Sequence, residues 1–375
     1  MTLPHYRSVD DLLASTAPDQ PVLCFCPSAF RREAERFVAG FPGDVHYAVK
    51  ANPHPAVLHW LTEGGVTGFD VASIAEIRLV REQLGDAHCA FNHPVKSRAD
   101  IKTAHDELGV RQFVIDHDRE LAKLADVCGR DCTVQVRIAR ANPDSAVDLN
   151  SKFGCDGQTA TSLMRRAGES GFDVAVAMHV GWQAPNPAAW GEAMAMAAGC
   201  ADAAGVSLKY ANLGGGYPSV LMPRDRKLED FFTAITAAKA QHLKGVDLNC
   251  EPGSALAWTG GATIAQVHLR KQDSLYLNDG IYGAMNEIKF SAIAPPATAY
   301  RSDGSRLDGS GRAFTVFGPT CDSLDVLPER IELPDTIDEG DYVVFEWMGA
   351  YSNALRTDFN GLGQLSYATV DEFPA

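Results

Sequence analysis

Short apolar runs alternate with longer amphipathic segments from about residue 45 to residue 255. Eight runs rich in β-branched, aromatic or small apolar residues recur: VHYAVKA (45–51), GFDVAS (68–73), CAFNHP (89–94), QFVIDH (112–117), TVQVRI (133–138), AVAMHVG (175–181), YANLGGG (210–216) and DLNCEPG (247–253). Runs of this length, separated by helical patterns, predict successive strand–helix units.

The segments between the runs carry helix signals. Residues 73–84 place Ser73 and Glu76 at the spacing of a capping box and continue with an apolar stripe at helical spacing. Residues 189–204 and 228–243 predict two further helices, which end near Gly205 and Gly245.

Eight strand–helix units match the size of a (β/α)₈ barrel, and the alternative is an open, doubly wound sheet. Polar residues or glycines stand at the C-terminal end of nearly every run: Lys50, Asp70, His93, Arg137, His179, Gly214 to Gly216 and Glu251. A closed barrel brings these ends together at one mouth, whereas an open sheet leaves the outer ones far apart. The pattern therefore favours the barrel.

Strand-like segments without a helical period follow Gly253, and the N-terminal PVLCFC also has the character of a strand. We therefore predict a barrel over residues 29–255. Residues 1–28 and 256–375 are predicted to form a mostly β domain, like a sandwich or barrel, that includes the N-terminal strand.

Composition narrows the function classes. Hydrophobic residues make up 46% and charged residues 22% of 375 positions, as in ordinary folded domains. The net charge of −15 disfavours binding to nucleic acid or to an anionic membrane. No apolar stretch approaches the roughly 18 residues of a membrane span. Nine cysteines without a C-x-x-C pair indicate no structural metal site and a reducing, cytoplasmic location.

Three of the strand-end features suggest one cofactor. Lys50 interrupts an apolar strand end, where partial burial favours a Schiff-base nucleophile over a surface charge. Gly214 to Gly216 follow the seventh run, where barrels usually bind phosphate, although a bare GGG is often only a tight turn. Glu251 ends the eighth run and can face a protonated ring nitrogen. Together these groups indicate pyridoxal 5′-phosphate (PLP).

The motifs in this order resemble the fold-III, alanine-racemase-like PLP decarboxylases, especially the ornithine/lysine decarboxylase group. The resemblance rests on YAVKAN, GFDVAS, VRIA, KFG, HVG, GGGYP, EPG, LNDGIYG, GPTCDSLD, GAY and FNG. It covers nearly the whole chain. It implies a barrel with a β domain, assembled as a head-to-tail homodimer with two active sites at the interface.

The resemblance also implies residue roles. Lys50 corresponds to the Schiff-base lysine, His179 to the histidine that stacks on the cofactor ring, and Glu251 to the partner of the ring nitrogen. The other implied cofactor-binding positions are Asp70, Arg137, Gly214, Gly215, Gly216, Ser254 and Tyr351.

The resemblance also implies roles for residues of the predicted β domain. Cys321, from the second subunit, is implied to protonate the substrate carbon after decarboxylation. The implied substrate-binding residues are Asp279, Tyr282 and Asp322, of which the two aspartates select a distal cation.

Two positions depart from the family pattern. Ser254 replaces an arginine that commonly clamps the cofactor phosphate, and Trp182 replaces a small residue after HVG. Arg356 is a candidate source of the missing positive charge.

We predict decarboxylation of L-ornithine to putrescine in polyamine biosynthesis. The alternatives are lysine, or a larger diamino acid such as a carboxy-polyamine or a secondary-metabolite precursor. A non-catalytic regulatory homologue is a further alternative, disfavoured because Lys50 and the Cys321–Asp322 pair are retained.

Overall fold

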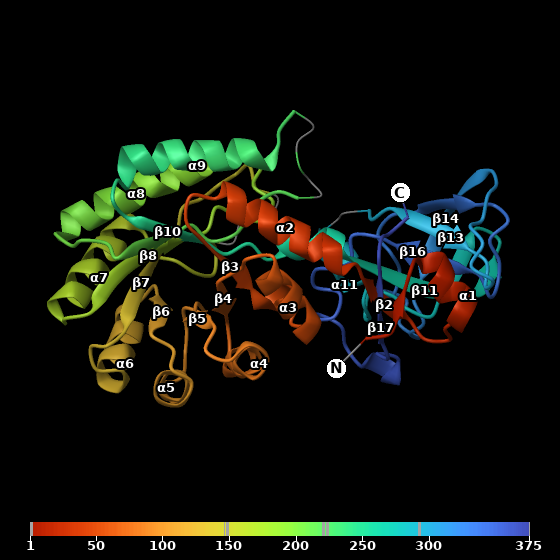
Figure 1. The fold of residues 1–375 in the computed structure, drawn as a ribbon, viewed down its shortest axis with the longest axis horizontal. Helices are drawn as coiled ribbons and strands as arrows, with labels where there is room; N and C mark the ends of the chain where they lie inside the picture. The colour runs from red at the N-terminus through yellow and green to blue at the C-terminus, as the bar shows by residue number, and fades with distance from the viewer. Residues whose placement is uncertain are drawn as a thin grey trace. The chain divides into compact units, whose positions relative to one another are not determined.

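The computed structural model describes residues 3–145, 147, 150–219, 222, 225–291 and 294–374. The chain forms two compact units, which are traced in Figure 1. The barrel unit comprises Glu33–Lys50 and Leu61–Ala255, and the β unit comprises Met1–Arg32, Ala51–Trp60 and Leu256–Ala375. Each unit is described separately below.

Eight parallel strands close into a barrel in the order β10-β3-β4-β5-β6-β7-β8-β9, which confirms the barrel over the open sheet. The strands are β3 (Asp44–Ala48), β4 (Gly68–Val71), β5 (His88–Phe91), β6 (Gln112–Ile115), β7 (Thr133–Ile138), β8 (Asp173–Met178), β9 (Tyr210–Asn212) and β10 (Asp247–Cys250). All eight overlap the predicted runs, so their C-terminal ends meet at one mouth.

Helices lie around the outside of these strands (Figure 1). They are α4 (Ile74–Leu84), α5 (Arg98–Lys102), α6 (Asp118–Val127), α7 (Gly157–Glu169), α8 (Ala188–Ala204) and α9 (Leu228–His242). Two further helices, α2 (Pro27–Gly40) and α3 (Pro55–Glu63), begin in the β unit and end in the barrel unit. The predicted cap of α4 is confirmed. The Glu76 N–H donates to Ser73 Oγ (3.2 Å), and Glu76 Oε2 accepts from the Ala72 N–H (2.6 Å). Within the described residues, none of the helices has both the length and the apolar character needed to cross a membrane.

The barrel interior contains several polar side chains at strand positions where aliphatic residues are usual. Gln135, Asn212 and Asn249 are each at most 6% exposed. Burying an amide is unfavourable unless it finds hydrogen-bond partners. The pairing of Gln135 and Asn212 is therefore part of the architecture of the mouth above them.

The β unit is built on a sheet with the strand order β1-β17-β2-β11-β12-β14-β15, in which β16 also pairs with β11 and β13. The predicted N-terminal strand is confirmed, because β2 lies between β11 and β17. The strands are β1 (His5–Tyr6), β2 (Val22–Phe25), β11 (Gly261–Lys271), β12 (Ser274–Leu277), β13 (Ala297–Tyr300), β14 (Gly311–Phe317), β15 (Ile331–Pro334), β16 (Tyr342–Phe345) and β17 (Ser366–Val370). The β unit also contains the helices α1 (Val9–Thr16) and α11 (Asn286–Ser291), and α10 (Ser254–Ala257) runs from the barrel unit into it.

The boundary between the units differs from a single cut at residue 29. Residues 51–60 belong to the β unit, because the Trp60 ring packs 5.6 Å from Phe30 and 6.0 Å from Phe25. His54 also packs against Phe25, at 5.3 Å. An aromatic cluster formed by residues distant in sequence therefore decides where this segment belongs.

Candidate active site

Lys50 follows β3 in a short 3₁₀ turn, Val49–Ala51. Its Nζ donates to Asp70 Oδ2 (3.2 Å) near the end of β4, and the two side chains form a salt bridge. The Lys50 side chain is 55% exposed, whereas that of Asp70 is 7% exposed. The Lys50 ammonium is thus held by a buried carboxylate, and its surroundings are more open than the apolar strand end suggested.

Glu251, after β10, is held by a ring of amides that sequence reasoning did not identify. Asn92 Nδ2 and Asn212 Nδ2 both donate to Glu251 Oε1, the latter at 2.5 Å. Gln135 links the two asparagines, since its Nε2 donates to Asn92 Oδ1 (2.9 Å) and its Oε1 accepts from Asn212 Nδ2 (3.1 Å). The available sequence signal was a Gln or Asn within two strands, β7 and β9, and an Asn directly after a third, β5.

Burial controls ionisation at this mouth. Burial, together with the negative charge of Asp70, raises the pKa of Glu251 to about 8, against the lowering effect of Lys50. Burial, with the positive charges of Arg137 and Lys50, lowers the pKa of His179 to about 3. His179 is therefore neutral at physiological pH, and its Nδ1 accepts from the Gly181 N–H (3.1 Å). Burial also lowers the pKa of Arg137.

The glycines after β9 are required by close backbone approaches. Gly214 has φ +64°, and a Cβ there would overlap the Met178 carbonyl oxygen. Gly216 has φ +90°, and a Cβ there would overlap the Gly181 carbonyl oxygen. A Cβ on Gly215 would lie 2.8 Å from the Glu251 carbonyl oxygen. The turn therefore lies between the ends of β8 and β10 and presents backbone without side chains.

The two departures from the family pattern are both at strand ends. Ser254 is 8% exposed and brings no positive charge. The Trp182 N–H donates to the Val147 carbonyl (3.1 Å), which forms an antiparallel bridge between the segments after β7 and β8. Trp182 is thus part of a contact that joins two loops at the mouth.

The β unit contains its own cluster of predicted residues. The Tyr282 hydroxyl donates to Asp322 Oδ2 (2.6 Å), and Asp322 Oδ1 accepts from the Leu324 N–H (2.9 Å). The Tyr282 hydrogen bond lowers the pKa of Asp322. Cys321 is the exposed member of the nine cysteines, and its Sγ lies 3.4 Å from Asn360 Oδ1. Asp322 and Cys321 are therefore accessible and oriented by neighbouring groups.

Two buried aspartates organise the loops around this cluster. Asp279 Oδ1 accepts from the N–H groups of Gly280 (2.9 Å) and Ala284 (3.1 Å), and burial raises the pKa of Asp279 to about 7. Asp325, which sequence reasoning missed, is 1% exposed. It accepts from the Ile281 N–H (3.0 Å) and from the Thr320 N–H (3.0 Å) and hydroxyl (2.7 Å). Asp325 therefore ties the LNDGIYG segment to the GPTCDSLD segment.

Tyr351 and Arg356 are also in the β unit. Tyr351 has φ +66°, and its N–H donates to the Ala51 carbonyl (2.6 Å). Arg356 Nη1 donates to the Gly363 carbonyl and lies 3.4 Å from Asp358 Oδ1. The Arg356 guanidinium is thus engaged within its own loop.

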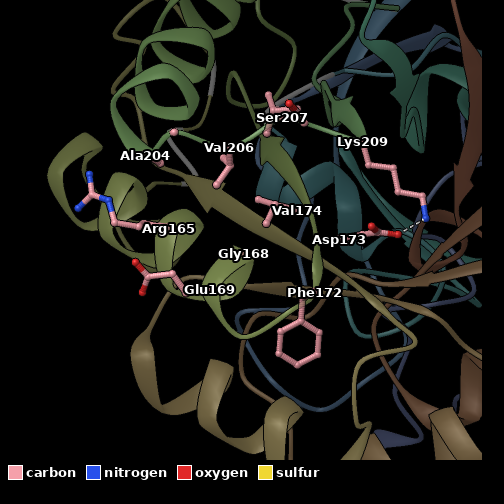
Figure 2. A pocket seen from close by; sticks show the side chains of 12 residues that line it. Arg165, Gly168, Glu169, Phe172, Asp173, Val174, Ala204, Val206, Ser207 and Lys209 are labelled. Atoms are coloured by element: carbon pink, nitrogen blue, oxygen red, sulfur yellow. Dashed lines mark hydrogen bonds and ion pairs between the residues drawn. The ribbon is translucent and has the colours of Figure 1, made fainter.

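A cavity of about 790 Å³ lies elsewhere on the barrel unit (Figure 2). It is lined by the C-terminal ends of α7 and α8, by the first residues of β8 and by the loop that leads into β9, where Lys209 Nζ pairs with Asp173 Oδ2 (2.6 Å). The first residues of parallel strands lie at the end of the barrel opposite Lys50 and Glu251. This cavity is therefore separate from the candidate active site.

The barrel mouth fits PLP in the types of group it offers. Lys50 provides an amine for the aldehyde, and Glu251 is a buried acid that can face the ring nitrogen. His179 is a neutral ring able to stack on the cofactor. The turn at Gly214 approaches backbone too closely to admit a side chain, as a phosphate-binding turn requires. Arg137 adds positive charge that acts on Glu251.

Comparisons with known proteins agree with this arrangement. Residues 28–258 match the model of the pyridoxal-binding domain of pyridoxal-dependent decarboxylases. Mouse ornithine decarboxylase is 33% identical over 344 residues, covering 84% of this chain and 72% of the relative. The lysine/ornithine decarboxylase of Vibrio vulnificus, solved with putrescine, superposes with a TM-score of 0.85 at 28% identity, covering 98% and 100% of the two chains. The arginine decarboxylase of Paramecium bursaria Chlorella virus gives a TM-score of 0.84 at 25% identity, covering 94% and 96%.

The family match covers more than half of the chain, and the named relatives act on basic amino acids. The fold, the donor groups at the barrel mouth and the relatives agree on both cofactor and reaction class. The chain therefore belongs to the fold-III pyridoxal-dependent decarboxylases of the ornithine/lysine group, and it is a PLP-dependent carboxy-lyase of basic amino acids.

Proposed function

We propose that this enzyme decarboxylates L-ornithine to putrescine in polyamine biosynthesis, with L-lysine as the next best substrate. The observation that carries the proposal is Asp322, an accessible carboxylate fixed by the Tyr282 hydroxyl at 2.6 Å and adjacent to the exposed Cys321. A fixed carboxylate favours a distal ammonium and repels a second carboxylate on the substrate. The named substrates of the mouse and Vibrio relatives support the same choice.

The barrel residues bind and orient the reacting groups. Bound PLP supplies an electron sink for the electron pair that CO₂ leaves behind. Lys50 Nζ carries the amine that anchors the cofactor, and Asp70 holds that amine at the strand end. Glu251 holds the proton of the ring nitrogen, and neutral His179 covers one ring face without adding charge.

The β-unit residues handle the substrate side chain and the returning proton. Asp322 binds the distal ammonium, with Tyr282 keeping its carboxylate in one orientation. Asp279, buried under the N–H groups of Gly280 and Ala284, orders the loop that carries Tyr282. Cys321 Sγ carries the proton that the substrate α-carbon receives once CO₂ has left, and Asn360 orients the thiol.

A homodimer completes this scheme, because the Cys321–Asp322 segment of one subunit serves the barrel mouth of the other. Exposed apolar side chains near this segment support such an interface. They are Phe290 (70% exposed), Leu324 (60%), Leu362 (45%) and Phe359 (43%), whose exposure to water is unfavourable.

The nine cysteines form no disulfide bonds, which supports the predicted cytoplasmic location.

Release of CO₂ from a panel of amino acids tests the proposal. The panel contains L- and D-ornithine, lysine, arginine, diaminopimelate and carboxynorspermidine, each assayed with wild type and with the Lys50→Ala control. We expect the highest kcat/KM for L-ornithine, lysine second, and no turnover by the control. A higher kcat/KM for lysine or arginine than for L-ornithine would reject the assignment.

A second candidate is a larger or modified diamino acid. The specific observation is the Trp182–Val147 bridge, which places a bulky residue where the family commonly has a small one. Ser254 also leaves the phosphate side without the usual arginine charge. Inert ornithine and lysine together with turnover of carboxynorspermidine would favour this candidate.

A further inference from the structure

The amide ring around Glu251 has a defined direction of hydrogen bonding. Glu251 Oε1 receives both hydrogen bonds, so it acts as an acceptor whether Glu251 is ionised or carries a proton on Oε2, and Asn92 and Asn212 both present their NH₂ groups to it. The Asn92 oxygen then accepts from Gln135 Nε2, and the Gln135 oxygen accepts from Asn212 Nδ2. The Asn212 oxygen is left to accept from the Gly214 N–H (2.9 Å). One acceptor atom, Glu251 Oε1, thus sets the orientation of three buried amides.

Asn212 joins two parts of the cofactor site. Its Nδ2 contacts Glu251, and its Oδ1 contacts the first glycine of the turn after β9. The same two segments are also linked through the backbone, because the Glu251 N–H donates to the Gly214 carbonyl (2.8 Å). The Asn212 side chain is 1% exposed, so both of its hydrogen bonds are shielded from water.

We infer that Asn212 is a positioning residue that couples Glu251 to the Gly214 turn. Asn92 and Gln135 form the opposite side of the hydrogen-bonded amide ring. This inference rests on the proposed role of Glu251 as the partner of the cofactor ring nitrogen. Two amide donors occupy Oε1, which directs the other carboxylate oxygen, Oε2, toward the cofactor. The same asparagine also holds the turn that is proposed to bind the phosphate. One side chain therefore fixes the position of Glu251 relative to the phosphate-binding turn.

The donors also counteract the effect of burial. A carboxylate in a water-poor site favours its protonated form, whereas hydrogen bonds to the ionised form favour the anion. The Asn212 hydrogen bond lowers the pKa of Glu251, against burial and the charge of Asp70. Removing this donor is expected to raise that pKa further and to weaken the pairing with a protonated ring nitrogen.

The Asn212→Asp variant separates the two contacts of Asn212. An aspartate keeps the size of the side chain and still accepts from the Gly214 N–H, but it has no donor for Glu251. Asn249→Asp is the matched control. Asn249 lies beside Asn212 on β10 and is 6% exposed, and its Oδ1 has no hydrogen-bond partner in the described part of the chain.

Two measurements are made on each variant. The first is an infrared titration of the protonated carboxyl band in apoprotein, with Glu251→Gln identifying the band of Glu251. The second is the dissociation constant of PLP. We expect Asn212→Asp to shift the Glu251 band to higher pH and to weaken PLP binding about tenfold, the effect of one charge-assisted hydrogen bond. Asn249→Asp is expected to change neither quantity.

A double-mutant cycle distinguishes positioning from a general structural role. If Asn212 acts through Glu251, Asn212→Asp has little further effect on PLP binding in the Glu251→Gln background. Equal effects in both backgrounds would overturn the inference. If Glu251→Gln alone leaves PLP affinity at the wild-type value, the proposed role of Glu251 fails. If Glu251→Gln weakens binding and Asn212→Asp does not, only the positioning role fails.

Discussion

Three carboxylates of this protein show how local partners set their chemistry. Glu251 and Asp279 are buried, and burial raises the pKa values of both. Asp322 is accessible, and the Tyr282 hydroxyl lowers its pKa. Asp322 therefore stays ionised where a cationic substrate would meet it. Glu251 is suited instead to share a proton with a cofactor ring.

The charge of Asp322 is tested by Asp322→Asn. We expect kcat/KM for L-ornithine to fall by about 10- to 100-fold, since a hydrogen bond to a charged group contributes about 1.5–3 kcal/mol. Most of this fall in kcat/KM should come from a higher KM rather than from a lower kcat. Tyr282→Phe is the control, because it removes the 2.6 Å hydrogen bond and keeps the negative charge. A larger loss in Tyr282→Phe than in Asp322→Asn would contradict the charge argument.

Asp325 is expected to matter for stability. Asp325→Ala leaves the N–H groups of Ile281 and Thr320 without their acceptor inside the β unit. We expect the free energy of unfolding to fall by about 2–4 kcal/mol, measured by urea denaturation. Asp358→Ala removes an exposed carboxylate and should cost less than about 1 kcal/mol. Equal losses in the two variants would show that the Asp325 hydrogen bonds add no stability.

Among the secondary-structure elements, the turn after β9 is the most tightly constrained. Gly214 combines a left-handed φ of +64° with a backbone oxygen where its Cβ would lie. Gly245, before β10, also has a positive φ (+80°), but an added Cβ would have open space. Alanine substitutions at Gly214 and Gly245 can therefore be compared to separate the effect of backbone strain from that of steric overlap.

We expect Gly214→Ala to weaken PLP binding and to lower the free energy of unfolding by about 2 kcal/mol or more. Strain and overlap both contribute in that variant. Gly245→Ala carries only the strain of the positive φ, about 1 kcal/mol, and leaves PLP affinity unchanged. Fluorescence titration with PLP and thermal unfolding measure the two effects. Unaltered PLP affinity in Gly214→Ala would exclude the turn from the cofactor site.

For the molecule as a whole, raised carboxyl pKa values predict how stability depends on pH. The pKa of Glu251 is about 8 in the folded chain and about 4.3 in the unfolded chain. Between these values the folded apoprotein holds a proton that the unfolded chain has released. The contribution of protonated Glu251 to the free energy of unfolding is therefore complete near pH 4 and is lost as pH rises toward 8.

The Tm of apoprotein measured from pH 5 to 9 should thus fall more steeply for wild type than for Glu251→Gln. Asp279, with its pKa of about 7, adds a slope of the same sign in both proteins. The comparison therefore isolates Glu251. Glu339→Gln, at an exposed position, should follow wild type. Parallel curves for wild type and Glu251→Gln would contradict a raised pKa.

The proposed dimer is tested by mixing two inactive variants. Lys50→Ala lacks the barrel amine, and Cys321→Ala lacks the thiol of the β unit. Random pairing makes half of the dimers hybrids, each with one intact site of two, so about a quarter of wild-type activity should return. If both residues served the site of their own subunit, the mixture would stay inactive.

Local patterns were enough to predict much of this protein. The eight runs, the cap at Ser73 and the motifs around Lys50, Glu251 and Cys321 depend on residues close together in the chain. Such signals act through backbone periodicity and short-range hydrogen bonds, which the order of residues specifies directly. The choice of a closed barrel also followed from local patterns, because nearly every run ended in polar residues or glycines.

Long-range packing decided the rest. The ring of Asn92, Gln135, Asn212 and Glu251 joins four strands, and no spacing along the chain shows which inward amides meet. Asp325 likewise accepts from Ile281, a partner 44 residues away in sequence, and the aromatic cluster at Trp60 assigns residues 51–60 to the β unit. A buried polar group takes whichever partner the fold brings within hydrogen-bond distance, so its role is decided only when the strands close around it.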